Sequence, residues 1–261
     1  ILQPLDLAPL FTPIYWDWLH WAANYYQAGL GDVLFQALPV KLRNGESAVK
    51  NDRTFWRITD AGKNALEQGL LKRSKKQVEA LQCLSEIDLE KGNNEFSSAI
   101  WSTLKSKGFI EEITIQTTPL SWQQSLGNNP IVNAENRLTL NKQQALAFSQ
   151  LLFHSGFNVW LLDGVTGSGK TEIYLQYIEE ILKSGKQVLV LVPEIGLTPQ
   201  TVQRFKARFN VEIDVLHSNL TDTQRLYVWD RARSGQSAIV IGTRSALFTQ
   251  FSNLGAIILD E

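Results

Sequence analysis

Short apolar runs alternate with longer amphipathic stretches in the second half of the chain. The apolar runs have the length of buried strands and cover 159–162, 188–192, 213–216, 238–241 and 256–259. Helical patterns separate most of them, over 172–183, 199–208 and 221–234. This alternation predicts an α/β domain over 138–261, with a mostly parallel sheet and helices on both faces.

The first part of the chain has a different pattern. Residues 12–28 predict an aromatic-rich helix that starts at Thr12-Pro13 and stops at Gly29, followed by a short helix before Pro39. We assign 1–53 to one small domain. The many rings of the first helix favour a small hydrophobic core, and base stacking is the less favoured alternative.

Residues 54–116 predict a strand, three helices and a closing strand, which is the outline of a winged-helix domain. The run Lys72-Arg73-Ser74-Lys75-Lys76 is the densest basic segment of the chain. It fits either the solvated start of a helix or a contact with nucleic-acid phosphates. Residues 117–137, rich in Asn, Gln, Pro, Thr and Ser, predict a linker.

Composition narrows the function classes. Of the 261 residues, 44% are apolar and 20% are charged, which is ordinary for a globular protein and excludes a fully disordered chain. With 25 basic and 26 acidic residues the net charge is −1, so any contact with DNA must come from local patches. The single cysteine, Cys83, excludes a disulfide scaffold and a cysteine-rich zinc site in this chain.

Targeting signals and chain ends also carry information. No apolar run reaches the roughly 18 residues of a membrane span, and no signal peptide is visible, so we expect a cytoplasmic protein without a membrane partner. The chain has no methionine and stops directly after an apolar run. We therefore interpret it as an internal fragment of a larger protein.

The strongest chemical signal is GVTGSGKT at 164–171, which matches the phosphate-binding loop G-x-x-x-x-G-K-[ST] at every fixed position. A predicted strand precedes it and a predicted helix follows. The loop backbone would bind phosphates, Lys170 would bind the β and γ phosphates, and Thr171 would bind Mg²⁺. The candidate nucleotide-binding residues are Gly164, Val165, Thr166, Gly167, Ser168, Gly169, Lys170 and Thr171.

A second signal is the apolar run that ends in Asp260-Glu261, the form of a Walker B element. Asp260 would hold Mg²⁺, and Glu261 would orient and deprotonate the attacking water. Alone, this pattern is weak. About 90 residues after a phosphate-binding loop, in an α/β pattern, it indicates an ATP-hydrolysing site in which Lys170 and Glu261 are catalytic.

Further motifs carry a family resemblance. They are LVPEIGLTPQ at 191–200, LHS at 216–218 and IGTRSALF at 241–248, with WAANYY at 21–26 and GDVLFQALP at 31–39. Together with the phosphate-binding loop, these segments resemble the bacterial primosomal replication-restart DNA helicases over essentially the whole chain.

The resemblance implies a superfamily 2 helicase with 3′→5′ polarity that recognises stalled or repaired forks and initiates replication restart. The implied partners are branched and single-stranded DNA, single-strand binding protein, and primosome or helicase-loader proteins. It implies the later part of a 3′-end DNA-binding domain, a winged-helix domain, and a first RecA-like lobe truncated at Walker B. Zinc is expected only in a missing C-terminal part, and the second motor lobe, which is also missing, leaves the fragment alone inactive.

The resemblance also assigns residues. Gln144 matches the glutamine that reads adenine, although Gln143 is a close competitor. Matches to DNA-contacting motifs are Thr198, Pro199, Gln200, Thr243 and Arg244. A helix cap is the alternative for Thr198, and a surface ion pair is the alternative for Arg244. His217 and Asp163 receive no role.

Two rival functions stay open. Another superfamily 2 translocase would share the nucleotide motifs but would not predict the winged helix or the 12–39 segment. A fork-DNA-binding adaptor with a vestigial nucleotide site is disfavoured by the intact Lys170, Thr171, Asp260 and Glu261.

Overall fold

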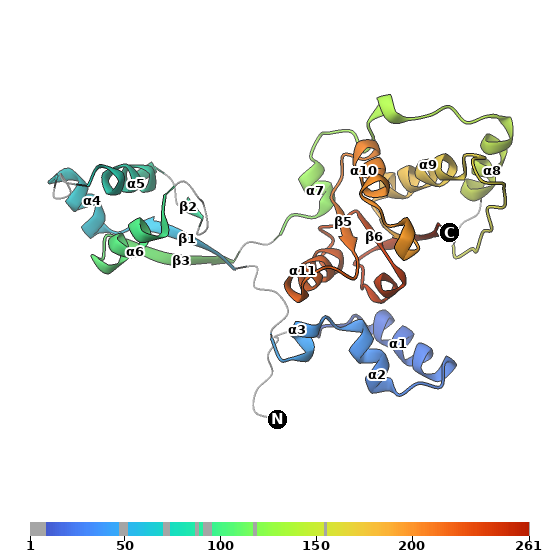
Figure 1. Cartoon of the computed structure of the whole chain (residues 1–261), viewed down its shortest axis with the longest axis horizontal. Coiled ribbons are helices and arrows are strands. Elements are labelled where there is room, and N and C mark those ends of the chain that lie inside the picture. The colour runs from blue at the N-terminus through green and yellow to red at the C-terminus, as the bar shows by residue number, and fades with distance from the viewer. Residues whose placement is uncertain are drawn as a thin grey trace. The chain divides into compact units, whose positions relative to one another are not determined.

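The computed structural model describes residues 9–46, 52–69, 74–86, 89–90, 96–116, 119–153 and 156–260. They divide into two compact units (Figure 1). The smaller unit spans 50–118, and the larger unit combines 1–49 with 119–261.

The smaller unit packs three helices against an antiparallel sheet of strand order β2-β1-β3. Its elements, in chain order, are β1 (Asp52–Ile58), α4 (Asp60–Glu67), α5 (Lys75–Glu86), β2 (Leu89–Glu90), α6 (Ser98–Ser106) and β3 (Ile110–Gln116). The stacked rings of Trp56 and Trp101, with centroids 5.8 Å apart, join β1 to α6 in its core. Gly62 in α4 lies so close to the Phe109 carbonyl that a Cβ there would collide with it.

The larger unit is built on four parallel strands in the order β5-β6-β4-β7. These strands are β4 (Gln187–Leu191), β5 (Ile213–Leu216), β6 (Ile239–Gly242) and β7 (Leu254–Leu259). The strands β4 and β6 are buried and, apart from Gln187 at the start of β4, apolar, as expected for strands covered on both faces. The predicted α/β fold with a parallel sheet is confirmed.

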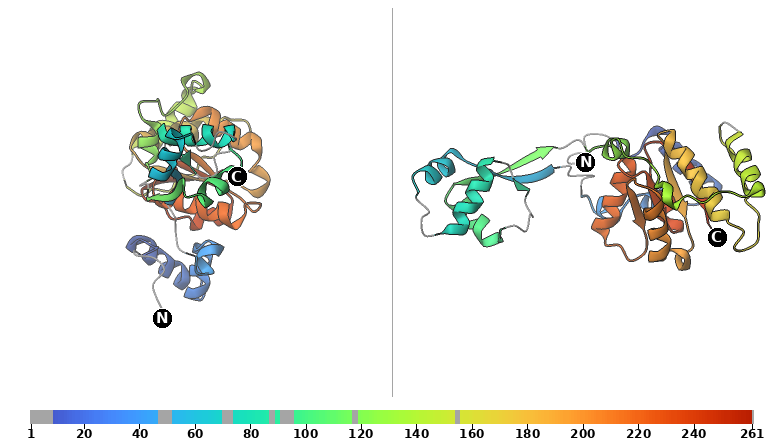
Figure 2. Two further views of the ribbon diagram at one scale, coloured as in Figure 1. Left: turned by 90° about the vertical axis from the view of Figure 1, so that its left-hand side faces the viewer. Right: turned by 90° about the horizontal axis from the view of Figure 1, so that it is seen from above.

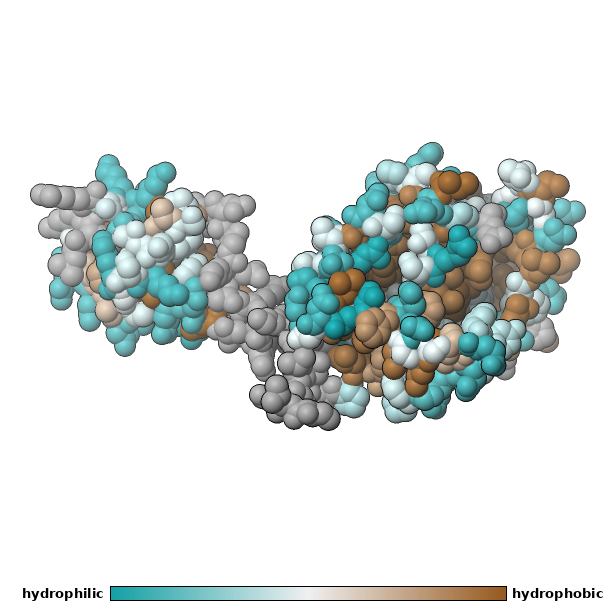
Figure 3. All heavy atoms as spheres, turned by 60° about the horizontal axis from the view of Figure 1, so that its bottom comes forward, coloured by the Kyte–Doolittle hydropathy of each residue, from teal (hydrophilic) through white to brown (hydrophobic). Residues whose placement is uncertain are grey.

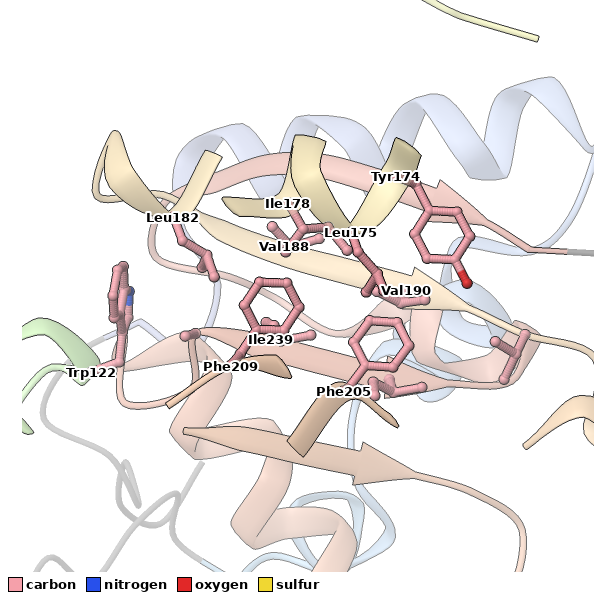
Figure 4. Packing of buried hydrophobic residues seen from close by; sticks show 13 residues of the cluster. Trp122, Tyr174, Leu175, Ile178, Leu182, Val188, Val190, Phe205, Phe209 and Ile239 are labelled. Atoms are coloured by element: carbon pink, nitrogen blue, oxygen red, sulfur yellow. The ribbon is translucent and has the colours of Figure 1, made fainter. Parts of the chain in front are cut away.

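Alternate residues of β4 and β6 point to opposite faces of this sheet. On one face Val188 and Val190 pack against α9 (Lys170–Lys183) and α10 (Pro199–Arg208), together with the buried Phe205 (Figure 4). On the other face Leu189 and Val240 pack against α11 (Asp222–Arg233). Helices therefore cover both faces, as the two views of Figure 2 also show.

The apolar run 159–162 does not form the strand that the sequence predicts. Residues 156–165 have no helix or strand, and Phe157 and Leu161 are 93% and 92% exposed. An apolar pattern shows only that a segment tends to be buried. A strand also needs a hydrogen-bonding neighbour, and no strand among the described residues pairs with 159–162. Exposed apolar side chains also line α8 (Lys142–Phe153), seen as brown spheres in Figure 3.

Residues 119–137, expected to be a linker, pack onto the larger unit. They contain α7 (Trp122–Leu126) and the 3₁₀ turn η1 (Ala134–Asn136). Trp122 is 2% exposed within the core that covers β4 and β6. The polar composition of this segment predicted a linker, but the single buried ring of Trp122 is enough to hold it on the larger unit.

Three helices near the N-terminus also belong to the larger unit. They are α1 (Pro13–Tyr25), α2 (Leu30–Ala37) and α3 (Val40–Arg43). Leu19 of α1 and Val33 of α2 are buried in a small core. The prediction that the aromatic rings of the helix over 12–28 build that core holds only in part: Tyr15 and Trp18 pack against it, and the other four rings are exposed. Within the described part of the chain, no helix has both the length and the apolar character needed to cross a membrane.

Candidate nucleotide site and DNA-facing edge

The segment 164–169 forms a tight loop that leads directly into α9. Gly167 and Gly169 have φ values of +81° and +83°, a region that favours glycine, and Gly169 is the N-cap of the helix. The Lys170 ammonium donates hydrogen bonds to the carbonyl oxygens of Gly164 and, at 3.2 Å, Val165. The loop thus curls around the lysine at the positive end of the helix.

Gln144 on α8, rather than Gln143, contacts this loop. Its side-chain amide donates to the Ser168 carbonyl at 2.8 Å, and its side-chain oxygen accepts from the Asn141 amide at 2.9 Å. Gln143 is exposed. A Cβ at Gly169 would displace the end of the Gln144 side chain from this contact, in addition to the strain that its positive φ would impose.

Asp260 follows β7 and lies against the first turn of α9. Its backbone amide donates to the Leu191 carbonyl at 2.9 Å, which continues the pairing of β7 with β4. Its carboxylate accepts a hydrogen bond of 2.7 Å from the Tyr174 hydroxyl. Burial, then the nearby Asp260 carboxylate, holds the pKa of Tyr174 well above its usual value, so this hydroxyl stays a donor.

Thr171 and Asp260 form an oxygen-only donor set near the phosphate loop. The Thr171 side chain also lies beside the Tyr174 hydroxyl, where its hydrogen bond lowers the pKa of Tyr174, so all three groups are neighbours. Hydroxyl and carboxylate oxygens are the ligands that Mg²⁺ prefers, so these residues fit the ion that the sequence predicts. Glu261 lies outside the described residues.

Two other predicted segments leave the carboxyl edge of the sheet. Thr198 caps α10 by accepting a hydrogen bond from the Thr201 amide at 3.2 Å, with Pro199 as the first helical residue and Gln200 exposed. Thr243 follows β6 and occupies the N-cap position of the 3₁₀ turn η3 (Arg244–Phe248), where its side chain makes no capping hydrogen bond. The helix-cap interpretation of Thr198 is therefore correct.

Arg244 is exposed, and no ion pair involves it among the described residues. The alternative interpretation of Arg244, a surface ion pair, therefore finds no support among the described residues. His217 lies between these segments, where its Nδ1 accepts from the Asn219 amide at 3.2 Å, a turn contact. The neighbouring Ser218 donates to the Glu194 carboxylate at 2.8 Å. Asp163 is exposed just before the loop.

The basic run is only partly described. Lys75 and Lys76 are exposed in the first turn of α5. Lys72 and Arg73 lie outside the described residues.

Two contacts near the site escaped the sequence analysis. One is the Tyr174–Asp260 hydrogen bond. The other is a buried ion pair in which Arg208 of α10 lies 3.1 Å from Glu172 of α9. A usable signal existed for the second, because Glu172, Gln176 and Glu179 place polar groups at helical spacing on a buried face.

Comparison with known proteins shows which class of protein this fold and site belong to. Residues 141–261 match the DEAD/DEAH box helicase family, and residues 1–39 match a family described as the 3′DNA-binding domain. With the phosphate loop and the parallel sheet, the first match defines residues 141–261 as a DEAD/DEAH box helicase domain.

Full-length relatives narrow the class to one family. The replication restart protein PriA of Haemophilus influenzae is 96% identical over 261 residues, which are 100% of this chain and 36% of that protein. PriA of Chlamydia muridarum is 35% identical over 260 residues, covering 94% of this chain and 33% of that protein. PriA of Bacillus subtilis is 42% identical over 168 residues, covering 63% of this chain and 20% of that protein.

The chain belongs to the PriA family of replication restart proteins. It spans about a third of the length of the Haemophilus and Chlamydia relatives.

Proposed function

We propose that this chain carries the nucleotide site and part of the DNA track of an ATP-dependent 3′→5′ DNA helicase. The full-length protein would recognise stalled or repaired forks and restart replication there. One observation carries the proposal: Asp260 lies against the helix that begins at the phosphate loop, while Thr198 and Thr243 leave the same carboxyl edge of the sheet. Ligands bind at that edge in open α/β sheets.

The phosphate loop would bind ATP through its backbone amides, and Lys170 would place its charge on the β and γ phosphates. Gln144, already held against the loop by Ser168, would read adenine. Thr171 and Asp260 would hold Mg²⁺, which neutralises charge on the phosphates when bound. Glu261 would accept the proton of the attacking water in an in-line displacement.

DNA would bind along the neighbouring segments. The N-terminus of α10 offers the Gln200 backbone amide and a favourable dipole for a backbone phosphate, with Thr198 and Pro199 beside it. Thr243 and the exposed guanidinium of Arg244 would hold a second phosphate. The smaller unit would act as a winged helix, with Lys72, Arg73, Lys75 and Lys76 contacting branched DNA.

The family supports the biological setting. We place the protein in the bacterial cytoplasm, at the nucleoid, with single-strand binding protein and primosome or helicase-loader proteins as partners. The 261-residue chain alone should hydrolyse ATP poorly. Motors of this kind take a transition-state arginine from a second lobe, and such a finger contributes roughly 10³–10⁵ in rate.

Strand displacement by the full-length protein tests this function. We expect unwinding of a partial duplex with a 3′ single-stranded tail and of a fork, with little unwinding of a 5′-tailed duplex. Lys170→Ala should abolish unwinding while fork binding persists. Fork binding without ATP-dependent unwinding in the wild type would favour the adaptor function and contradict the proposal.

A further inference from the structure

Tyr174 lies where the phosphate-loop helix meets the end of β7. It is the fifth residue of α9, which begins at Lys170, so it stands one turn into the helix on the side of Lys170 and Thr171. Its ring belongs to the core, 8% exposed, and stacks on Phe205 of α10 with centroids 6.4 Å apart. Figure 4 shows the ring at the arrowhead end of the strands.

The ring packing leaves the hydroxyl two polar neighbours, Thr171 and Asp260. It donates a hydrogen bond of 2.7 Å to Oδ2 of Asp260. Because Tyr174 is held between two helices, its hydroxyl is fixed in position before any ligand binds. The Asp260 backbone amide donates to the Leu191 carbonyl at 2.9 Å, a contact that fixes the backbone after β7 but not the rotation of the carboxylate.

We infer that Tyr174 is a positioning residue that orients the Asp260 carboxylate for Mg²⁺ in the nucleotide site. The inference rests on the proposed function, since it assigns Asp260 to the metal. The hydrogen bond engages one carboxylate oxygen, fixes the rotation of the carboxylate, and leaves the other oxygen to face the ion or its water. Hydrogen bonds of this kind to metal-binding carboxylates are a general means of tuning metal affinity.

Tyr174→Phe is the natural test, because it removes only the hydroxyl and keeps the ring against Phe205. Tyr177→Phe is the matched control: Tyr177 is on the same helix, and its hydroxyl has no hydrogen bond among the described residues. A fluorescent ATP analogue would be titrated onto full-length wild type and both variants, once in EDTA and once across a series of Mg²⁺ concentrations.

We expect Tyr174→Phe to need roughly 10-fold or more Mg²⁺ for half-maximal binding, the effect typical of losing such a partner. Its nucleotide affinity in EDTA should match wild type, which also shows that the fold is intact. Tyr177→Phe should behave as wild type in both series. If Tyr174→Phe needs no more Mg²⁺ than wild type, or if its affinity falls equally with and without Mg²⁺, the inference is wrong. If wild type itself shows no Mg²⁺-dependent binding, the proposed function fails and the inference fails with it.

Discussion

The guanidinium of Arg208 lies 3.1 Å from the carboxylate of Glu172, and both side chains are almost completely buried. Glu172 is two residues after Lys170 in α9, and Arg208 ends α10, the helix that Thr198 caps. The pair therefore ties the helix of the nucleotide site to a helix of the DNA-facing edge. A second acid, Glu179, lies 3.9 Å from the same guanidinium.

Arg208→Met should lower the free energy of unfolding of this chain by about 3–5 kcal/mol, because it leaves the buried Glu172 carboxylate without its cation. Adding Glu172→Gln to that variant should restore part of the loss. Lys206→Met, at an exposed position of the same helix, should change stability by less than about 0.5 kcal/mol. Urea denaturation measures all three. If Arg208→Met and Lys206→Met are equally stable, the buried pair does not stabilise the domain.

Tyr15 of α1 should hold the η3 turn in place. Its hydroxyl donates to the Phe248 carbonyl at 2.6 Å, and the neighbouring Trp18 packs on the Phe248 ring with centroids 5.6 Å apart. Tyr15→Phe should cost about 1 kcal/mol, since it leaves that carbonyl without its donor. Amides of 243–248 should then exchange hydrogen faster.

The control for this change is Tyr25→Phe, because Tyr25 is 65% exposed and its hydroxyl has no hydrogen bond among the described residues. It should leave exchange in η3 unchanged. Equal exchange in the two variants would show that α1 does not support this turn.

Arg244→Ala should weaken binding of single-stranded DNA without changing nucleotide affinity. Removing its interaction with one phosphate should reduce the slope of log K against log salt by about 0.7. Lys186→Ala is the control, because Lys186 is exposed just before β4, at the opposite edge of the sheet. Fluorescence anisotropy at several salt concentrations gives the slopes. If the Arg244→Ala slope equals that of wild type, Arg244 does not contact a DNA phosphate.

Neutralising Lys72, Arg73, Lys75 and Lys76 together should flatten the salt dependence of binding to branched duplex DNA. The slope should fall by up to about 0.9 for every phosphate that these side chains neutralise in the wild type. The same anisotropy titration on a forked substrate checks this. An unchanged slope would show that the basic run does not contact DNA phosphates and is only the solvated start of a helix.

Local signals in the sequence were sufficient for most elements. The helix predicted over 199–208 has the observed bounds of α10, because Thr198 and Pro199 form a cap and first turn that need no distant partner. The strand predicted over 213–216 coincides with β5. The phosphate loop was equally predictable, since its glycines meet a backbone requirement within the loop itself.

Contacts between distant segments could not be predicted in the same way. Glu172 and Arg208 are 36 positions apart, and Tyr174 and Asp260 are 86 apart, so no spacing in the sequence links one partner to the other. The strand predicted over 159–162 is wrong for a related reason, because pairing depends on a neighbour elsewhere in the chain. The sequence alone could not distinguish Gln144 from Gln143; the contact with Ser168 shows that Gln144 is the one beside the phosphate loop.

ATP hydrolysis stimulated by DNA is the most direct test of the account. Phosphate release would be measured for the full-length protein, wild type and Lys170→Ala, with and without single-stranded or forked DNA. We predict that DNA accelerates hydrolysis by the wild type and that Lys170→Ala hydrolyses ATP no faster with DNA than without it, although it still binds the fork. A wild type whose hydrolysis ignores DNA, or a Lys170→Ala variant that retains the stimulated rate, would contradict the assignment of this chain to a DNA motor.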